Sequence, residues 1–427
     1  MKNAIVISIS LTLVLLDFLV PEFAVASIKG EMFFRSKHRL MAFSRNEDKS
    51  LGQEHWLKFE SLLAFSQSLS LQAEVLASAG DYRTSLYQKS DKTDLSNQAS
   101  EIWPGDMYLQ YASRAVLARF GYQRISWHEG FSSSYTNFIN PRDQRISFFE
   151  DADLVFRSVP MMNLIASGDS LSLQLLFIPF TAIDLLPPFS RLGGKGGIPL
   201  LPSQKVEVRD LESSSSVLNY GARTTWAGEG FDVSVFAARI QDRQALYELN
   251  PISDSSRLLL EPTQTAMSTF GITSSIVTGE STWRIEYMHI PSRRFGRISG
   301  TSLEGVERSE SDVTLGFESP AWGKLSLELQ HSISILNKEI VGGLREAQES
   351  LSFARLDYSF GDDRTLRLLA AYLHADRSLF GRVGYSWPLN QQVELEIAVE
   401  AAGGPLQSQG AAMSGMSRIF GQITHTL

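Results

Sequence analysis

Apolar and polar residues alternate along much of the chain. In VELEIAVEA (393–401), Val393, Leu395, Ile397 and Val399 are apolar, and most of the residues between them are glutamates. Successive side chains of a β-strand point to opposite faces, so such a segment is predicted to be a strand with one apolar and one polar face. The same period of two recurs in KLSLELQ (324–330), TWRIEYM (282–288), VTLGFE (313–318) and LSLQAEVLA (69–77).

Two architectures use strands of this kind. A soluble sandwich packs the apolar faces of two sheets together. A transmembrane barrel turns the apolar face to lipid and the polar face to its lumen. The segments alternate over about nine residues, the length that crosses a bilayer when tilted, so an antiparallel transmembrane β-barrel is favoured. Aromatic residues stand near predicted strand ends, as a girdle at the membrane interface requires: Trp226, Trp283, Trp322, Tyr372, Tyr385 and Trp387.

The alternation also assigns faces. Leu395, Ile397, Leu327 and Ile285 are predicted to face lipid. Glu394, Glu396, Glu328 and Arg284 are predicted to face the lumen. The wall of the lumen would then carry charges of both signs, from Arg284, Glu286, Arg355, Asp357, Glu394 and Glu396.

The spacing of these segments predicts about 16 strands, within a range of roughly 14 to 18, because single-chain bacterial barrels have even numbers. Tight breaks at 227–230 and 361–363 alternate with long polar ones at 291–310 and 335–350. SRIFGQITHTL (417–427) is predicted to form the last strand, with Ile419, Ile423 and Leu427 on one face. The other candidate strands are 28–44, 55–66, 69–79, 107–118, 120–127, 154–165, 171–180, 217–227, 231–241, 265–277, 281–290, 311–319, 323–334, 351–360, 364–374, 378–387 and 392–401.

The first residues, 1–26, are typical of a cleaved signal peptide. Lys2 precedes an apolar run (4–20), and the small residues around Val25 predict cleavage after Ala26. The alternative is an uncleaved anchor helix. Under the first interpretation, residues 27–427 form a single barrel domain.

Composition narrows the classes further. The chain contains no cysteine, which excludes disulfides and thiolate metal sites. Its formal net charge of −8 argues against a nucleic-acid partner, which would need a basic surface. After the N-terminal run, the longest apolar candidate, LSLQLLFIPF (171–180), is too short to cross a bilayer as a helix.

Four motifs follow one another in a fixed order: GYQRISWHE (121–129), NFINPRD (137–143), RSVPMMNL (157–164) and LQLLFIPF (173–180). In this order they resemble a porin-like family of bacterial outer-membrane β-barrel proteins that is defined by a domain of unknown function. That family combines a Trp-x-Glu corner, an Asn-Pro-x-Asp segment, and Val-Pro and Ile-Pro strands. The resemblance implies a barrel in the outer membrane of a Gram-negative bacterium. It implies no particular substrate.

The segment FINPRDQR (138–145) is neither a regular helix nor a clean strand. Asn140 precedes Pro141, which favours extended backbone followed by a turn. Its charged residues cannot face lipid, so a segment near 128–153 is expected either to fold inward and narrow the lumen or to form a simple periplasmic turn. If it folds inward, the candidate constriction residues are Glu129, Arg142, Asp143, Arg145 and Arg157.

Other candidate sites have plain structural interpretations. His289, His331 and His374 continue the apolar face at strand ends and are expected to be interface residues. His128 and Glu129 would need a positioned serine for hydrolase chemistry, and the spacing identifies none. The Gly-rich run 191–205 is expected to be a loop rather than a phosphate site, and EDAD (150–153) a solvated acidic turn rather than a Ca²⁺ site.

The chain is therefore expected to be an outer-membrane channel for passive or weakly selective passage of small solutes, without catalysis and without a cofactor. Its expected partners are outer-membrane lipid and lipopolysaccharide, the barrel-assembly machinery and small solutes. Two alternatives stay open. One is an outer-membrane enzyme acting on lipid or lipopolysaccharide, which would need a catalytic cluster on adjacent strands at the bilayer surface. The other is a plugged structural or export-accessory barrel.

Overall fold

The computed structural model describes residues 29–43, 50–80, 99–130, 137–143, 149–150, 152–184, 205–208, 218–244, 246–251, 257–299, 302–341, 343, 346–361, 363–405 and 417–426. The expected signal peptide, the Gly-rich run up to residue 204, Arg145 and Leu427 lie outside these residues. Among the described residues, no helix is long and apolar enough to cross a membrane.

The described chain is almost entirely β-structure, as its period-two pattern predicts. A single short helix, α3, covers Ala152–Val155. The strands are β1 (Lys29–Phe43), β2 (Ser50–Ala64), β3 (Leu69–Gly80), β4 (Ala99–Ala112), β5 (Val116–Gln123), β6 (Val159–Ser167), β7 (Leu171–Ile178), β8 (Lys205–Val208), β9 (Asn219–Gly228), β10 (Phe231–Gln241), β11 (Leu246–Pro251), β12 (Arg257–Thr263), β13 (Ala266–Thr278), β14 (Ser281–Ser299), β15 (Ser302–Glu318), β16 (Leu325–Leu336), β17 (Gln348–Gly361), β18 (Arg364–Leu373), β19 (Ser378–Pro388), β20 (Val393–Gly403) and β21 (Arg418–Thr426).

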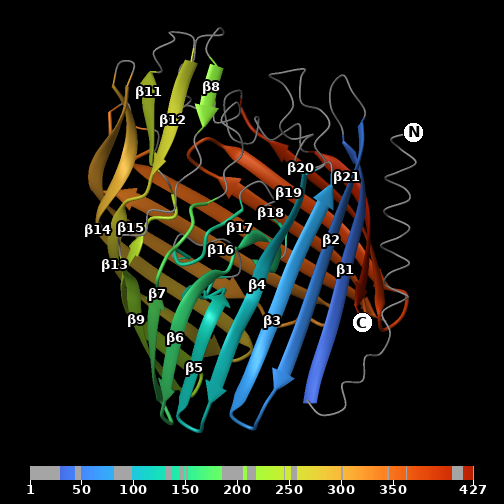
Figure 1. Cartoon of the computed structure of the whole chain (residues 1–427). Coiled ribbons are helices and arrows are strands. Elements are labelled where there is room, and N and C mark those ends of the chain that lie inside the picture. Colours follow the sequence, from blue (N-terminus) through green and yellow to red (C-terminus); the bar gives the residue numbers. More distant parts are fainter. Residues whose placement is uncertain are drawn as a thin grey trace.

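Eighteen of these strands form one closed antiparallel sheet (Figure 1). Consecutive strands of the sheet pair with each other, and β1 pairs with β21 so that Lys37 lies opposite Thr424. Closure leaves no unpaired edge, which is what a sheet needs in lipid, where water cannot satisfy backbone groups. The predicted transmembrane barrel is confirmed, and its strand number is the upper end of the predicted range.

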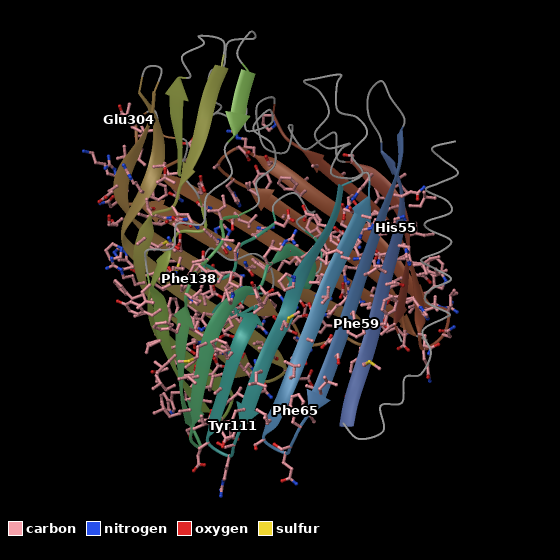
Figure 2. The ribbon with its side chains drawn as sticks, in the orientation of Figure 1. His55, Phe59, Phe65, Tyr111, Phe138 and Glu304 are labelled. Atoms are coloured by element: carbon pink, nitrogen blue, oxygen red, sulfur yellow. The ribbon has the colours of Figure 1, made fainter. Side chains whose placement is uncertain are left out.

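The two ends of the barrel differ. Turns such as 229–230 and 279–280 are tight, and their glycines Gly230 and Gly279 adopt positive φ angles of 73° and 65°. β1 begins and β21 ends at this same end, while β3, β5 and β7 end at the other, and more than fifteen residues separate each of these three from the next barrel strand. Because outer-membrane barrels have short periplasmic turns, the tight-turn end is the periplasmic end. Figure 2 shows Phe65 and Tyr111 near it and Glu304 near the outer end.

The faces of the strands follow the predicted alternation. Ile285 is 45% exposed and Ile397 is 53% exposed on the outside, whereas Glu286 is fully buried on the inside. Leu395 and Leu327 share the outward face, and Arg284, Glu328, Glu394 and Glu396 share the inward one. Aromatic rings pack together around the periplasmic end, in the pairs Trp226–Phe231, Trp283–Phe317 and Tyr385–Trp387, as an interfacial girdle does.

Some strand boundaries differ from those predicted. The segments 107–118 and 120–127 were expected to be separate strands, but the turn falls earlier, between β4 and β5. There the Ser113 hydroxyl accepts a hydrogen bond from the backbone N–H of Val116 (3.1 Å), which fixes the turn locally. Residues 154–155 belong to α3 rather than to β6. Outside the barrel wall, β8, β11 and β12 form a three-stranded sheet that the alternation did not predict.

Candidate functional site

The described residues of the connection between β5 and β6 (124–130, 137–143, 149–150 and 152–158) fold into the barrel, and we call them the inward segment. Its described residues contact inward-facing side chains of β1, β9, β14, β19 and β21, which lie all around the wall. A segment with partners on every side of a closed sheet lies within it. Figure 1 shows this trace crossing the interior, and Figure 2 places Phe138 within the barrel.

Asn140 ties the beginning and end of the inward segment together. Its side-chain oxygen accepts a hydrogen bond from the N–H of Ile125 (2.7 Å), and its amide nitrogen donates to the carbonyls of Gln123 (3.0 Å) and Arg157 (2.9 Å). The carbonyl of Pro141 accepts a further bond from the N–H of Arg157 (2.9 Å). The Asn-Pro pair therefore acts inside the outer half of the barrel and does not form a periplasmic turn.

Three apolar residues of the inward segment, Trp127, Phe138 and Ile139, form what we call the apolar anchor. All three are buried in one cluster with inward-facing residues of β6, β7, β10, β13 and β14. The ring centroids of Trp127 lie 5.9 Å from those of Phe138 and 5.6 Å from those of Phe236. The indole N–H of Trp127 donates to the side-chain oxygen of Gln174 (2.8 Å), so the one polar atom of this ring is satisfied.

Next to the apolar anchor, the wall holds the backbone of the inward segment. The Glu286 carboxylate accepts hydrogen bonds from the N–H groups of Glu129 (2.5 Å) and Gly130 (2.7 Å). Arg223 in turn forms an ion pair with Glu129 (2.5 Å). Burial lowers the pKa of the neighbouring His128 despite the nearby carboxylates of Glu286 and Glu129.

Glu150 reaches the opposite side of the wall, and we call its contacts the ionic clamp. Its carboxylate lies 2.9 Å from Lys37, 2.6 Å from Arg39, 3.6 Å from Arg418 and 3.9 Å from Arg382. The Glu150 side chain is only 2% exposed. Burial alone would raise the pKa of this carboxyl, but the charges of Arg39, Lys37 and Arg382 hold it well below its usual range.

The wall around the ionic clamp is built from charges and one aromatic ring. Glu54 pairs with Arg39 and Arg418 (both 3.0 Å), and Arg382 pairs with wall carboxylates as well. The three arginines stand over the ring of Phe420, at 4.2 to 5.3 Å from its centroid. The wall offers four cations here, Lys37, Arg39, Arg382 and Arg418, against three carboxylates, Glu54, Glu396 and Glu400. Glu150 supplies the fourth negative charge.

Four of the predicted constriction residues, Glu129, Arg142, Asp143 and Arg157, lie within the described part of the inward segment. Arg157 pairs with Asp143 (2.7 Å) and Glu101 (3.0 Å) and stacks over Trp103 at 3.8 Å. The backbone N–H of Arg142 donates to Asp184 (2.8 Å), and burial, helped by the charge of Arg243, lowers the pKa of its guanidinium to about 10. The structure therefore brings Glu129, Arg142, Asp143 and Arg157 into the lumen.

The predicted wall residues fall into two groups, one in contact with the inward segment or the ionic clamp and one nearer the periplasmic end. Glu286 lies beneath the inward segment, as described above, and Glu396 pairs with Arg382 (2.5 Å) beside the ionic clamp. Arg284 pairs with Glu318 (3.1 Å), and Arg355 pairs with Asp357 (2.5 Å), nearer the periplasmic end. Glu394 is exposed at that end of β20.

The sequence did not predict the ionic clamp. Glu150 was expected to be part of a solvated acidic turn, and that interpretation is wrong, because its carboxylate is buried among cations. Lys37, Arg39, Arg382 and Arg418 stand at inward positions of predicted strands, which was the available signal. Which carboxylate would meet them depended on a contact across 111 residues or more.

The barrel is similar to solved bacterial structures over nearly its whole length. OccK8 (OprE) of Pseudomonas aeruginosa has 7% sequence identity and a TM-score of 0.52, and the match covers 93% of this chain and 98% of that one. OccAB4 of Acinetobacter baumannii has 9% identity and a TM-score of 0.50, with the same coverage. OpdK, an outer-membrane protein of P. aeruginosa solved with vanillate, has 11% identity and a TM-score of 0.50, again with this coverage. At such identities the likeness is one of fold.

The chain has the fold of an outer-membrane β-barrel. Its outward apolar face and its girdle of aromatic rings agree with that location. A scan against protein-family models and a search of the curated proteins found no match. The resemblance to a porin-like family therefore stays a prediction.

Proposed function

We propose that the protein is a channel for passive or weakly selective passage of small solutes, narrowed by the inward segment. The observation that carries this proposal is the charged inner face of the periplasmic half. The side chains of Arg355, Arg367 and Glu318 face inward, and 33%, 48% and 40% of their surface is exposed. Charged groups exposed toward the inside of a closed sheet need water around them, which supports a hydrated vestibule.

The outer half has a different character. There the inward segment crosses the lumen, and Glu286, Glu150 and Asp143 are buried. A solute would pass between the segment and the wall, among fixed charges of both signs. Fixed charges in a narrow passage create local fields that discriminate between ions, so selectivity would be decided at this level.

Planar-bilayer conductance tests the proposal. The wild-type barrel is expected to conduct, and a variant in which residues 127–155 are replaced by a short Gly-Ser linker is expected to conduct several-fold more. Ile397→Val, a conservative change on the lipid face, is the matched control and should leave conductance unchanged. A wild-type barrel that inserts but carries no current, beside a linker variant that does, would contradict the proposal and favour a plugged barrel.

Cysteine accessibility gives a second test, since the chain contains no cysteine of its own. Arg284→Cys and Glu396→Cys are expected to react with a membrane-impermeant thiol reagent through the lumen. Ile285→Cys and Ile397→Cys on the lipid face should resist it. Reaction of the lipid-facing pair alone would be incompatible with a water-filled interior.

A further inference from the structure

A serine on the outer face of the barrel lies between His331 of the neighbouring strand β16 and His374, which follows the other neighbouring strand, β18. The Ser352 hydroxyl oxygen in β17 is 2.8 Å from Nε2 of His374 and 2.9 Å from Nδ1 of His331. The two imidazole rings stand perpendicular, with centroids 5.5 Å apart, and the ring of Tyr372 packs against His374. Leu351 and Phe353, the neighbours of Ser352 along β17, are buried on the inner side. Ser352 therefore faces outward.

The cluster lies at the level of the outer end of β18. His374 begins the turn after β18, on the side of the barrel with the long connections, which is the side away from the periplasm. Wall strands of an outer-membrane barrel end near the membrane interface, where lipid ester groups lie between the acyl chains and the headgroups. The position is therefore one at which a protein side chain can meet a lipid ester.

The hydrogen-bond geometry suits an activated serine. A hydroxyl has one proton, so it donates to one imidazole and accepts from the N–H of the other. With Nε2 of His374 as acceptor and Nδ1–H of His331 as donor, the first histidine is placed to remove the proton of Ser352. His331 is placed to stabilise negative charge on Oγ of Ser352. A nucleophile within hydrogen-bond reach of a base is the arrangement that acyl transfer requires.

An apolar groove lies on the same outer face, directly on the periplasmic side of this cluster. Its volume is about 290 Å³. Small residues form one row across four paired strands, Ala354, Ala370, Gly381 and Ala401, and larger ones form the next row, Leu356, Leu368, Val383 and Val399. The first row stands two residues from Ser352 and Tyr372 along their strands. A lipid chain in the groove would run toward the membrane centre, with its ester beside the serine.

From these two observations we infer that Ser352, His374 and the groove form an acyl-ester hydrolase site for outer-leaflet lipids. Oγ of Ser352 attacks the ester carbonyl carbon while Nε2 of His374 takes the hydroxyl proton. The bond to the lipid alcohol breaks, and that oxygen receives the proton from His374. Water, deprotonated by the same imidazole, then attacks the acyl-serine ester. The bond to Oγ breaks, Oγ of Ser352 takes the proton back from His374, and a fatty acid is released. The site goes beyond the channel and acts whether or not the lumen conducts.

A second Ser–His pair shows what distinguishes the proposed site. His289 Nδ1 lies 2.8 Å from the Ser311 hydroxyl, also on the outer face, and its ring packs against Phe270. Among the described contacts, this serine bonds one histidine rather than two, and the groove residues do not include its neighbours. Ser311→Ala is therefore the matched control.

The experiment uses the purified full-length barrel in mixed micelles with a diacyl phosphatidylethanolamine, and fatty-acid release is measured. Ser352→Ala and His374→Asn should each lower the rate by at least about 100-fold, as loss of a nucleophile or its base does. Ser311→Ala should keep the wild-type rate. A long-chain fluorophosphonate should label the wild-type protein at Ser352, as read by peptide mass spectrometry.

A second variant separates chemistry from chain binding. A Cβ built on Gly381 would have Leu369 O as its nearest neighbour at 3.8 Å, so a larger side chain can enter the groove without meeting backbone. Gly381→Leu should abolish the preference for sixteen-carbon over four-carbon nitrophenyl esters, measured as the ratio of the two kcat/KM values. Absence of both release and labelling in a folded wild-type barrel would overturn the inference. So would equal rates in wild type and Ser352→Ala.

Discussion

The apolar anchor and the ionic clamp hold the same inward segment to opposite sides of the wall by different forces. Trp127, Phe138 and Ile139 bury apolar surface, which depends little on salt or pH. Glu150 is held by four cations, whose attraction is large only because the site is shielded from water. The apolar anchor is expected to determine whether the segment stays in the lumen, and the ionic clamp to determine the charge that a solute meets there.

The largest expected effect comes from removing the strand that carries part of the clamp and also closes the barrel. Deletion of residues 418–427 takes away β21 and with it Arg418 and Phe420. An open edge in lipid leaves backbone groups unpaired at several kcal/mol each, so assembly should fail completely. Heat-modifiable mobility on SDS gels measures assembly, and removal of Leu427 alone is the control. A folded, inserted product of the long deletion would contradict the closure.

Trp127→Ala tests the apolar anchor. Large-to-small changes in a buried cluster cost about 3–5 kcal/mol, which should loosen the inward segment while the wall stays intact. Hydrogen exchange at the amides of residues 138–140 should accelerate by roughly 100-fold or more. Trp226→Ala, on the outer face, is the control and should leave these amides protected. Unchanged exchange in Trp127→Ala would show that the ionic clamp alone suffices.

Glu150→Gln tests the ionic clamp. The clamp would then hold four cations and three carboxylates, an excess of one positive charge. The passage should therefore become several-fold more selective for anions. Reversal potentials in a salt gradient measure this shift. Asp169→Asn, which removes a negative charge at a periplasmic turn, should leave the reversal potential unchanged. Equal shifts in both variants would mean that the lumen field does not depend on Glu150.

The smallest expected effect is that of pH on the clamp. A carboxyl whose pKa is lowered in the folded state stabilises that state above its unfolded pKa of about 4.3, and the contribution disappears as pH falls through the folded value. The wild-type reversal potential should therefore be constant between about pH 8 and pH 5. A change toward anion selectivity is expected only below roughly pH 4. A midpoint near pH 6 would exclude Glu150 as the group responsible.

The strands of the wall could be predicted from the sequence because the alternation that produces them is a local property of each segment. Alternation in segments such as 282–288 and 393–401 places each side chain on one face, and the structure confirms those faces. The alternation did not locate the turn between β4 and β5. There the Ser113 hydroxyl stabilises a turn, although the apolar pattern continues through 107–118. The turn was therefore misplaced by a few residues.

The interior was less predictable. The Asn-Pro segment was recognisable as unusual, since Pro141 interrupts both helix and strand, and Trp127 and Phe138 stood close by. Nothing local to Glu150, however, tells whether it meets water or Arg39. The cluster of His331, Ser352 and His374 was likewise hidden, because its residues are brought together only by the register of three strands. His331 and His374 were each expected to be interface residues, and nothing in the sequence near them indicates that both bond Ser352.

The pairing of β1 with β21 also sets the order in which the molecule can be completed. Arg39 belongs to the first barrel strand and Arg418 to the last, so the two meet only when the ends of the chain come together. Contacts of such wide sequence separation form late and slowly, because loop closure must come first. Until β1 and β21 pair, Glu150 has no complete set of counter-charges, so a complete clamp requires a closed barrel. All four cations can therefore surround Glu150 only after the barrel has closed.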